Sequence, residues 1–257
     1  RPKGLETVPS FFVKFRKDFD AVDGEPLEID VSADERYVLL LDGRELSRGP
    51  ARGMPSHWFC QKVTEPVSAG SHRLEAVVWT LGTNAPTAQL TRGGGFFLKA
   101  SGKADAQLTT GKGDWLVASL HGTVADGKSY PVSFGCGTQF RVSGCSMLEE
   151  EPPSGRWHPA HVTVRSVKAT ASPWGRVAST PAVYESALPE MMSRPVKPGE
   201  IPQGRLDVPA RTRREWLFDL GDYYCAYPFL TVSGGKGAKI RFGFSECLVG
   251  KDGKKLH

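Results

Sequence analysis

The chain has 257 residues, a formal net charge of +5, 29 glycines and 19 prolines. This length suits one large all-β domain or two smaller ones, and so much glycine and proline favours many tight turns. The basic residues are scattered singly along the chain, which argues against a nucleic-acid partner. The longest apolar runs, Tyr37–Leu41 and Ala76–Leu81, have only the length of strands, so we expect no membrane span.

Strands separated by turn residues are predicted through the first hundred residues. Apolar and polar side chains alternate in Phe11–Arg16 and again in Leu27–Val31, which is the period of a half-buried strand. Tyr37–Leu41 runs into Asp42-Gly43, a dipeptide that accepts positive φ and closes a two-residue hairpin. Further strands are predicted at Leu74–Leu81 and Phe96–Ala100.

The pattern continues beyond residue 114 and then weakens. Strands are predicted at Trp115–Leu120, Tyr130–Phe134, Gln139–Val142 and His161–Val167. Seven prolines between residues 173 and 209 remove ladder donors and oppose helix formation, so this stretch reads as an extended linker. A second β unit follows, with strands predicted at Trp216–Asp219, Phe229–Ser233 and Ala238–Phe244, too few for an independent pair of sheets.

These segments predict an all-β protein. We expect a β-sandwich of the jelly-roll type over residues 1–170, a proline-rich linker over residues 171–205, and the start of a second, incomplete β-sandwich unit over residues 206–257.

One short motif imitates a phosphate-binding loop. Residues Gly122–Ser129 satisfy the pattern GxxxxGK[ST], which needs a helix directly after the Lys-Ser pair. The following Tyr130–Gly135 is aromatic, β-branched and interrupted by proline, so no helix is expected there. We predict a hairpin turn at Ala125–Lys128 and no nucleotide site.

No set of catalytic residues stands out. The histidines are dispersed, and no Gly-x-Ser-x-Gly elbow is present. Glycoside hydrolysis needs two facing carboxyl groups, and turn capping or solvation accounts for each available pair. These pairs are Asp34 with Glu35, Asp219 with Asp222, and Glu246 with Asp252. We therefore predict no catalytic residue, no metal site and no cofactor. Calcium stays an open alternative, although no loop has enough closely spaced Asp and Glu to name its ligands.

The five cysteines contain no CxxC pair, which argues against a zinc site. Buried free thiols are predicted, and a Cys136–Cys145 hairpin bridge is the alternative.

The loop from Arg48 to Trp58 is the candidate carbohydrate-binding site. Its glycines and prolines argue against a strand, and it carries side chains suited to sugars: aromatic rings stack on sugar C–H faces, and Arg and His contact hydroxyls. The candidate residues are Arg48, Arg52, His57 and Trp58. In the alternative, Trp58 packs inside the sandwich and the arginines are solvated.

Two blocks of sequence carry a family resemblance. Ala33–Pro50 resembles the stretch D-x-x-Y-x-L-x-x-N-G-x-x-V-x-x-G-P of the N-terminal galactose-binding-like sandwiches in bacterial α-L-rhamnosidases, with Asp42 where that family usually has Asn. The second block looks like the β domain that precedes their catalytic domain, although Ala226 stands where Gly is common. This block comprises Val208–Ala210, Phe218–Gly221, Tyr227-Pro228, Val232–Ala238, Glu246–Leu248 and Gly253–Lys255.

In that family, catalysis belongs to a downstream α/α toroid with paired carboxylates, and nothing in residues 1–257 resembles it. The resemblance therefore implies a non-catalytic accessory region of an α-L-rhamnosidase-like glycoside hydrolase that acts on rhamnose-containing polysaccharide. Its implied partners are carbohydrate and the downstream catalytic domain of the same polypeptide. A periplasmic or extracellular location is implied too, although the chain begins at Arg1 without a recognisable signal peptide.

Two alternatives from other classes stay open. The first is a free-standing carbohydrate-binding module that tethers a partner to polysaccharide. The second is a structural domain that contacts other proteins through an exposed sheet edge.

Overall fold

The computed structural model describes residues 9–54, 57–85, 89–91, 93–128, 138–162, 167–168, 182–189, 192–196, 205–244, 248–249 and 254–256. The chain divides into two units, Arg1–Pro189 and Glu190–His257. The strands are β1 (Phe11–Ala21), β2 (Leu27–Asp34), β3 (Arg36–Leu41), β4 (Arg44–Gly49), β5 (Trp58–Glu65), β6 (Gly70–Thr80), β7 (Gly95–Ala100), β8 (Leu116–Ser119), β9 (Thr123–Lys128), β10 (Thr138–Val142), β11 (His158–Pro159), β12 (Val167–Lys168), β13 (Ala182–Glu185), β14 (Leu248–Val249) and β15 (Lys255–Leu256). The helical pieces are α1 (Asp105–Leu108) and the 3-10 turns Gly82–Asn84, Gly102–Ala104 and Ser154–Arg156.

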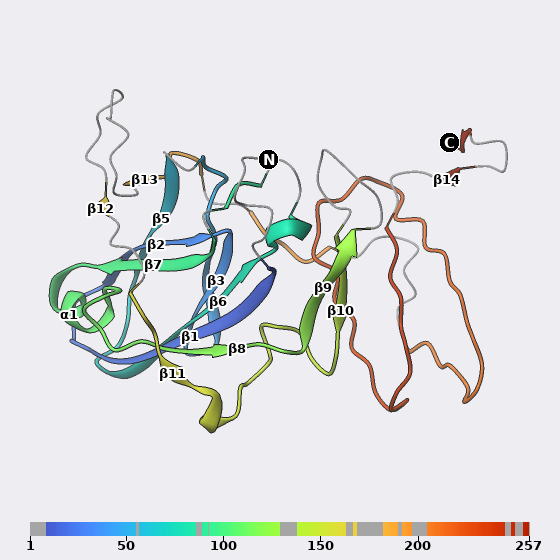
Figure 1. The fold of residues 1–257 in the computed structure, drawn as a ribbon, viewed down its shortest axis with the longest axis horizontal. Helices are drawn as coiled ribbons and strands as arrows, with labels where there is room; N and C mark the ends of the chain where they lie inside the picture. Colours follow the sequence, from blue (N-terminus) through green and yellow to red (C-terminus); the bar gives the residue numbers. More distant parts are fainter. Residues whose placement is uncertain are drawn as a thin grey trace. The chain divides into compact units, whose positions relative to one another are not determined.

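Two large sheets form the sandwich of the first unit, and β9 and β10 make a separate two-stranded sheet (Figure 1). One has six strands in the order β11-β8-β1-β6-β3-β4, with every neighbouring pair antiparallel. The other has five strands in the order β12-β13-β5-β2-β7, and here β12, β13 and β5 run parallel. This arrangement confirms the all-β sandwich predicted from the alternating pattern.

The main core lies where the inward faces of the two sheets meet. Along β1 the side chains of Val13, Phe15 and Phe19 point inward, and Leu74 and Val78 of β6 meet them from the neighbouring strand. Full burial of each such side chain stabilises the fold by roughly 1.5–3 kcal/mol. The fully or nearly buried members of this core are Phe19, Leu27, Ile29, Val31, Ala33, Tyr37, Leu39, Leu41, Leu74, Ala76, Val78, Leu98, Ala100, Leu108 and Trp115.

The hairpin between β3 and β4 forms as the sequence predicts. Asp42 and Gly43 occupy its two turn positions with φ of 50° and 80°, the left-handed values that Asp and Gly accept best. The Asp42 backbone N–H also donates to the carbonyl oxygen of Arg73 at 2.9 Å, which joins this turn to β6.

Two strands of the five-stranded sheet fall where the sequence predicts irregular chain. Trp58, expected in a loop, is the first residue of β5, because the aromatic and β-branched run that it opens pairs with β2. Residues 182–185, within the expected linker, form β13 in parallel to β5. The boundaries of domains and linker stay a prediction.

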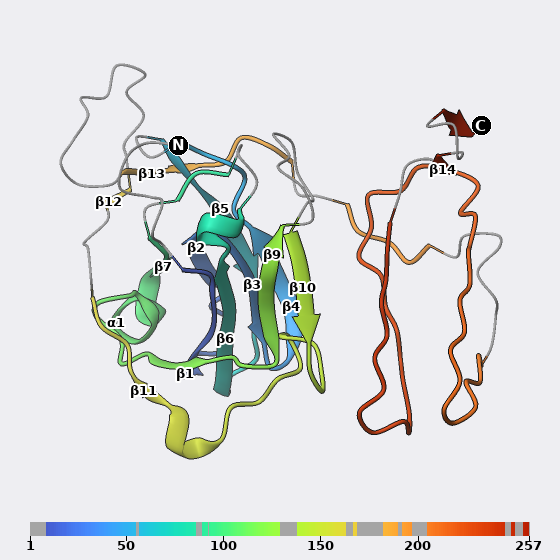
Figure 2. The same cartoon turned by 45° about the vertical axis from the view of Figure 1, so that its right-hand side comes forward.

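The hairpin of β9 and β10 covers part of the outer face of the six-stranded sheet (Figure 2). A second apolar cluster lies there, in which Phe12, Val77 and Leu120 pack against Ala125 and Leu148. Ala125–Lys128 is therefore part of strand β9, and the hairpin turn predicted there is wrong. The strand predicted at Tyr130–Phe134 lies outside the described residues, as does most of that at His161–Val167.

The second unit differs from the expected start of a β-sandwich. Residues 205–244 carry no β-ladder, so the strands predicted at Trp216–Asp219, Phe229–Ser233 and Ala238–Phe244 do not form as paired strands. A strand needs a neighbour to satisfy its backbone groups, and these residues find none among the described part of the chain. Many large apolar side chains here are exposed, including Leu217, Tyr223, Tyr227, Phe229, Ile240, Phe242 and Phe244.

Candidate functional site

The loop between β4 and β5 carries two of the predicted sugar-binding residues, Arg52 and His57, while Arg48 belongs to β4 and Trp58 to β5. Backbone hydrogen bonds between Met54 and His57, at 3.1 and 2.8 Å, close the loop. Gly53 permits this closure, because a Cβ at that position would lie 2.4 Å from the His57 carbonyl oxygen. Any larger residue at position 53 would push His57 and the start of β5 away.

Trp58 lies inside the fold. Its side chain keeps 8% exposure, and its indole N–H donates to the carbonyl oxygen of Ala33 at 2.9 Å. A ring in this position exposes little surface, which favours the alternative that Trp58 packs within the sandwich. Tying an indole to a backbone carbonyl is how a buried Trp satisfies its polar atom.

The two arginines of the loop have different surroundings. Arg48 lies on edge strand β4, where its Nε and one terminal nitrogen contact the two carboxylate oxygens of Glu45 at 2.7 and 2.6 Å. Such a two-point contact holds the guanidinium against its own strand. Arg52 is exposed, as is His57. Whether Arg48, Arg52, His57 and Trp58 contact carbohydrate stays a prediction.

His57 belongs to an aromatic group that the sequence did not reveal. Its ring stacks on the ring of Tyr184 with centroids 3.7 Å apart and an angle of 7°, and meets Phe59 edge-on at 5.1 Å. Tyr184 arrives through the parallel pairing of β13 with β5, which places it opposite Phe59. We call His57, Phe59 and Tyr184 the aromatic group. A planar stack with one exposed member suits a sugar ring better than the buried Trp58 does.

Sequence reasoning missed Tyr184 because it lies among prolines. The run Ala182-Val183-Tyr184-Glu185 contains a β-branched and an aromatic residue, which is a weak strand signal. Four residues are too few to outweigh the surrounding prolines, and the parallel partner is more than a hundred residues away in the chain.

The candidate carboxylate pairs are tied to nearby backbone. Glu35 is 1% exposed, and its carboxylate accepts the N–H groups of Leu81 and Gly82 at 3.0 and 3.2 Å. Burial raises the pKa of Glu35, and the two backbone donors oppose that rise. The neighbouring carboxylate of Asp34 accepts the N–H of Gly94 at 3.3 Å. This pair anchors the loop between β6 and β7.

The second pair has an equally local role. Asp219 accepts the N–H of Gly221 at 2.8 Å, and Asp222 accepts that of Tyr223 at 2.7 Å, as carboxylates in turns do. Glu246 and Asp252, the third pair, lie outside the described residues.

The glycine-rich motif at residues 122–129 has its first backbone donor occupied by a side chain. The Glu150 carboxylate accepts the N–H groups of His121 and Gly122 at 2.8 and 2.9 Å, and the chain then enters β9. A negative side chain thus lies at the glycine from which a phosphate loop would start, and a strand follows it. The absence of a nucleotide site stays a prediction.

Cysteine and metal chemistry can be described for part of the chain. Cys60, Cys145 and Cys225 form no disulfide with one another, and only Cys60 is buried, so the expected burial is wrong for the other two. Cys136 and Cys247 lie outside the described residues. Within the described ranges, no three His, Cys, Asp or Glu side chains come together as metal ligands would. The helices described are also too short to cross a bilayer.

Comparison with known proteins identifies a similar fold. No family model matches the chain, and no curated protein matches its sequence. Among solved structures, the GH78 family rhamnosidase of Bacillus sp. GL1 is similar with a TM-score of 0.52 and 19% identity. The match covers 76% of this chain and 20% of the rhamnosidase, so the likeness concerns about a fifth of that protein's length. At this identity it shows a shared fold with one region of a glycoside hydrolase.

Proposed function

We propose that this chain is a non-catalytic accessory region of an α-L-rhamnosidase-like glycoside hydrolase. The likeness of its fold to a fifth of a GH78 rhamnosidase carries the proposal. The tethering of the Asp34 and Glu35 carboxylates to backbone N–H groups supports a non-catalytic role, because paired acids in glycosidases must reach a scissile bond. Activity towards rhamnose-containing polysaccharide would then lie in another part of the polypeptide, in a periplasmic or extracellular setting.

The second unit would join the sandwich to that other part. Residues 205–244 are extended, and side chains such as Phe229 and Phe244 are 97% and 73% exposed. Apolar surface of this extent is costly in water, and unpaired strand edges readily accept further strands. Further polypeptide that supplies those strands, including the catalytic domain, is the partner that we propose for this unit.

The first experiment is hydrolysis of an aryl α-L-rhamnoside by the purified chain, with circular dichroism to verify that the sandwich is folded. We expect no release of the aryl group. Release above the uncatalysed rate by folded chain, lost when a carboxylate such as Asp219 is replaced by Asn, would overturn the proposal.

The aromatic group favours a second candidate, a carbohydrate-binding module. Exposed His57 stacked on Tyr184 offers a planar surface for a sugar ring, and exposed Arg52 lies in the same loop as His57. Retention on insoluble polysaccharide that is lost in Tyr184→Ala, but kept in Tyr223→Ala of the second unit, would support this candidate. No retention on any glycan would remove it.

A further inference from the structure

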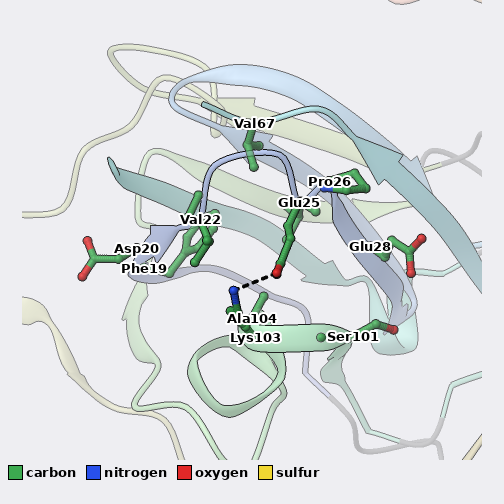
Figure 3. A pocket seen from close by; sticks show the side chains of 13 residues that line it. Phe19, Asp20, Val22, Glu25, Pro26, Glu28, Val67, Ser101, Lys103 and Ala104 are labelled. Carbon is green, nitrogen blue, oxygen red and sulfur yellow. Dashed lines mark ion pairs between the residues drawn. The ribbon is translucent and has the colours of Figure 1, made fainter. Parts of the chain in front are cut away.

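A hollow of about 390 Å³ opens between the turn that joins β1 to β2 and the segment that follows β7 (Figure 3). Its volume lies at the lower end of the range for small-ligand sites. Phe19 and Leu27 belong to the sandwich core with 3% and 2% exposure, so they give the hollow a fixed apolar floor. Val22, Pro26 and Val67 add apolar walls.

One ion pair spans this hollow. Lys103 Nζ lies 2.8 Å from Glu25 Oε1, and both side chains are about half exposed, so either can turn toward a ligand. Figure 3 shows these two side chains reaching toward one another, whereas the carboxylates of Asp20 and Glu28 point away from the space between them. A ligand in the hollow therefore meets one carboxylate and one ammonium group.

The wall that carries Val67 is held in place before any ligand arrives. His72 Nε2 donates to the Ser68 carbonyl oxygen at 2.9 Å, and His72 Nδ1 lies 2.7 Å from Asp42 Oδ2. The His72 ring also contacts the Phe19 ring, with centroids 5.8 Å apart. These contacts fix the turn between β5 and β6 beside the floor, and preformed walls reduce the cost of ordering on binding.

We propose that this hollow binds a neutral sugar of monosaccharide size. A cationic ligand would have to displace Lys103 from Glu25, and an anionic one would have to displace Glu25 from Lys103. Adjacent hydroxyls can instead donate to the Glu25 carboxylate and accept from the Lys103 ammonium, so both charges keep a partner. The C–H face of the sugar then lies on the apolar walls. This site is separate from the aromatic group and needs only the fold of the first unit.

The test is a titration of the whole chain with a panel of neutral monosaccharides, followed by amide NMR shifts. We expect saturable shifts at residues 22–26 and 101–104, with a Kd on the order of millimolar for so small a ligand. Glu25→Gln and Lys103→Met should each weaken binding roughly tenfold, because each removes one charged hydrogen-bond partner. Lys112→Met, which breaks the Lys112–Asp105 ion pair outside the lining of the hollow, is the matched control and should bind as wild type does.

Three outcomes would overturn the proposal: no saturable shifts with any sugar, shifts that Glu25→Gln and Lys103→Met leave unchanged, or saturation by choline or acetate in place of sugars. Amide spectra of the variants without ligand show whether each is folded. If either Glu25→Gln or Lys103→Met does not fold, the other variant still tests the site. Loss of sugar binding in Tyr184→Ala alone would assign the ligand to the aromatic group. The rhamnoside assay tests the proposed function independently, since an inactive accessory region can lack this site.

Discussion

Replacement of Trp58 by alanine tests whether this side chain stabilises the five-stranded sheet or is available to bind a sugar. The side chain is 8% exposed, and its N–H satisfies the Ala33 carbonyl oxygen at 2.9 Å. Removing a buried Trp in this way costs roughly 3–5 kcal/mol, including the cavity that it leaves. Trp58→Phe keeps most of the ring and loses the hydrogen bond, so its cost should be about 1–2 kcal/mol.

Urea unfolding followed by far-UV circular dichroism measures both costs. With an m-value of about 2 kcal/mol per molar urea, a loss of about 4 kcal/mol lowers the midpoint by roughly 2 M. Trp216→Ala is the matched control: Trp216 is 46% exposed in the second unit, and its loss should change the free energy of unfolding of the first unit by less than about 0.5 kcal/mol. Equal midpoints for Trp58→Ala and Trp216→Ala would refute the packing role and leave the Trp58 ring available to ligands.

Two further predictions concern the ion pair between Asp42 and His72, and Gly94. The Asp42 carboxylate raises the pKa of His72, so the stabilisation from this pair is full below the ordinary His pKa of about 6.5 and is lost as the pH rises through the raised value. In thermal unfolding across a pH series, the Tm difference between wild type and Asp42→Asn should therefore be large near about pH 5.5 and shrink in alkaline buffer; a difference that grows with pH would contradict this. Gly94→Ala should cost roughly 1–3 kcal/mol more than Gly93→Ala, because its new Cβ would lie 2.1 Å from Phe11 Cζ whereas that at position 93 meets nothing within 4 Å. Both glycines have positive φ, so equal losses would mean that backbone strain alone matters.

The sequence pattern predicted the turns and strands that depend only on residues close together in the chain. The Asp42-Gly43 turn needs only two residues that accept positive φ, and the alternation in Phe11–Arg16 is enough to identify β1 as a strand. It does not show that Phe12 and Lys14, on the opposite face from Val13 and Phe15, are buried as well. The segment after Gly122–Ser129, for which the sequence predicts no helix, lies outside the described residues.

Elements that depend on distant partners could not be predicted in this way. Whether Trp58 is exposed depends on its pairing with β13, more than a hundred residues later in the chain, and on the carbonyl oxygen of Ala33. The stacking of His57 on Tyr184 depends on the same pairing. In the second unit, the alternating pattern of Ala238–Phe244 predicts a strand correctly only if a neighbouring strand is present to bond with it.

The most direct test of the proposed function is the size of the natural protein that contains this sequence. An antibody raised against the first unit would be used on fractionated extract of the native source, with aryl α-L-rhamnoside hydrolysis measured in each fraction. We predict a band several times heavier than the 28.0 kDa of this chain, in the same fractions as the rhamnosidase activity. A band near 28.0 kDa, in fractions without that activity, would contradict the accessory role and favour a self-contained binding module.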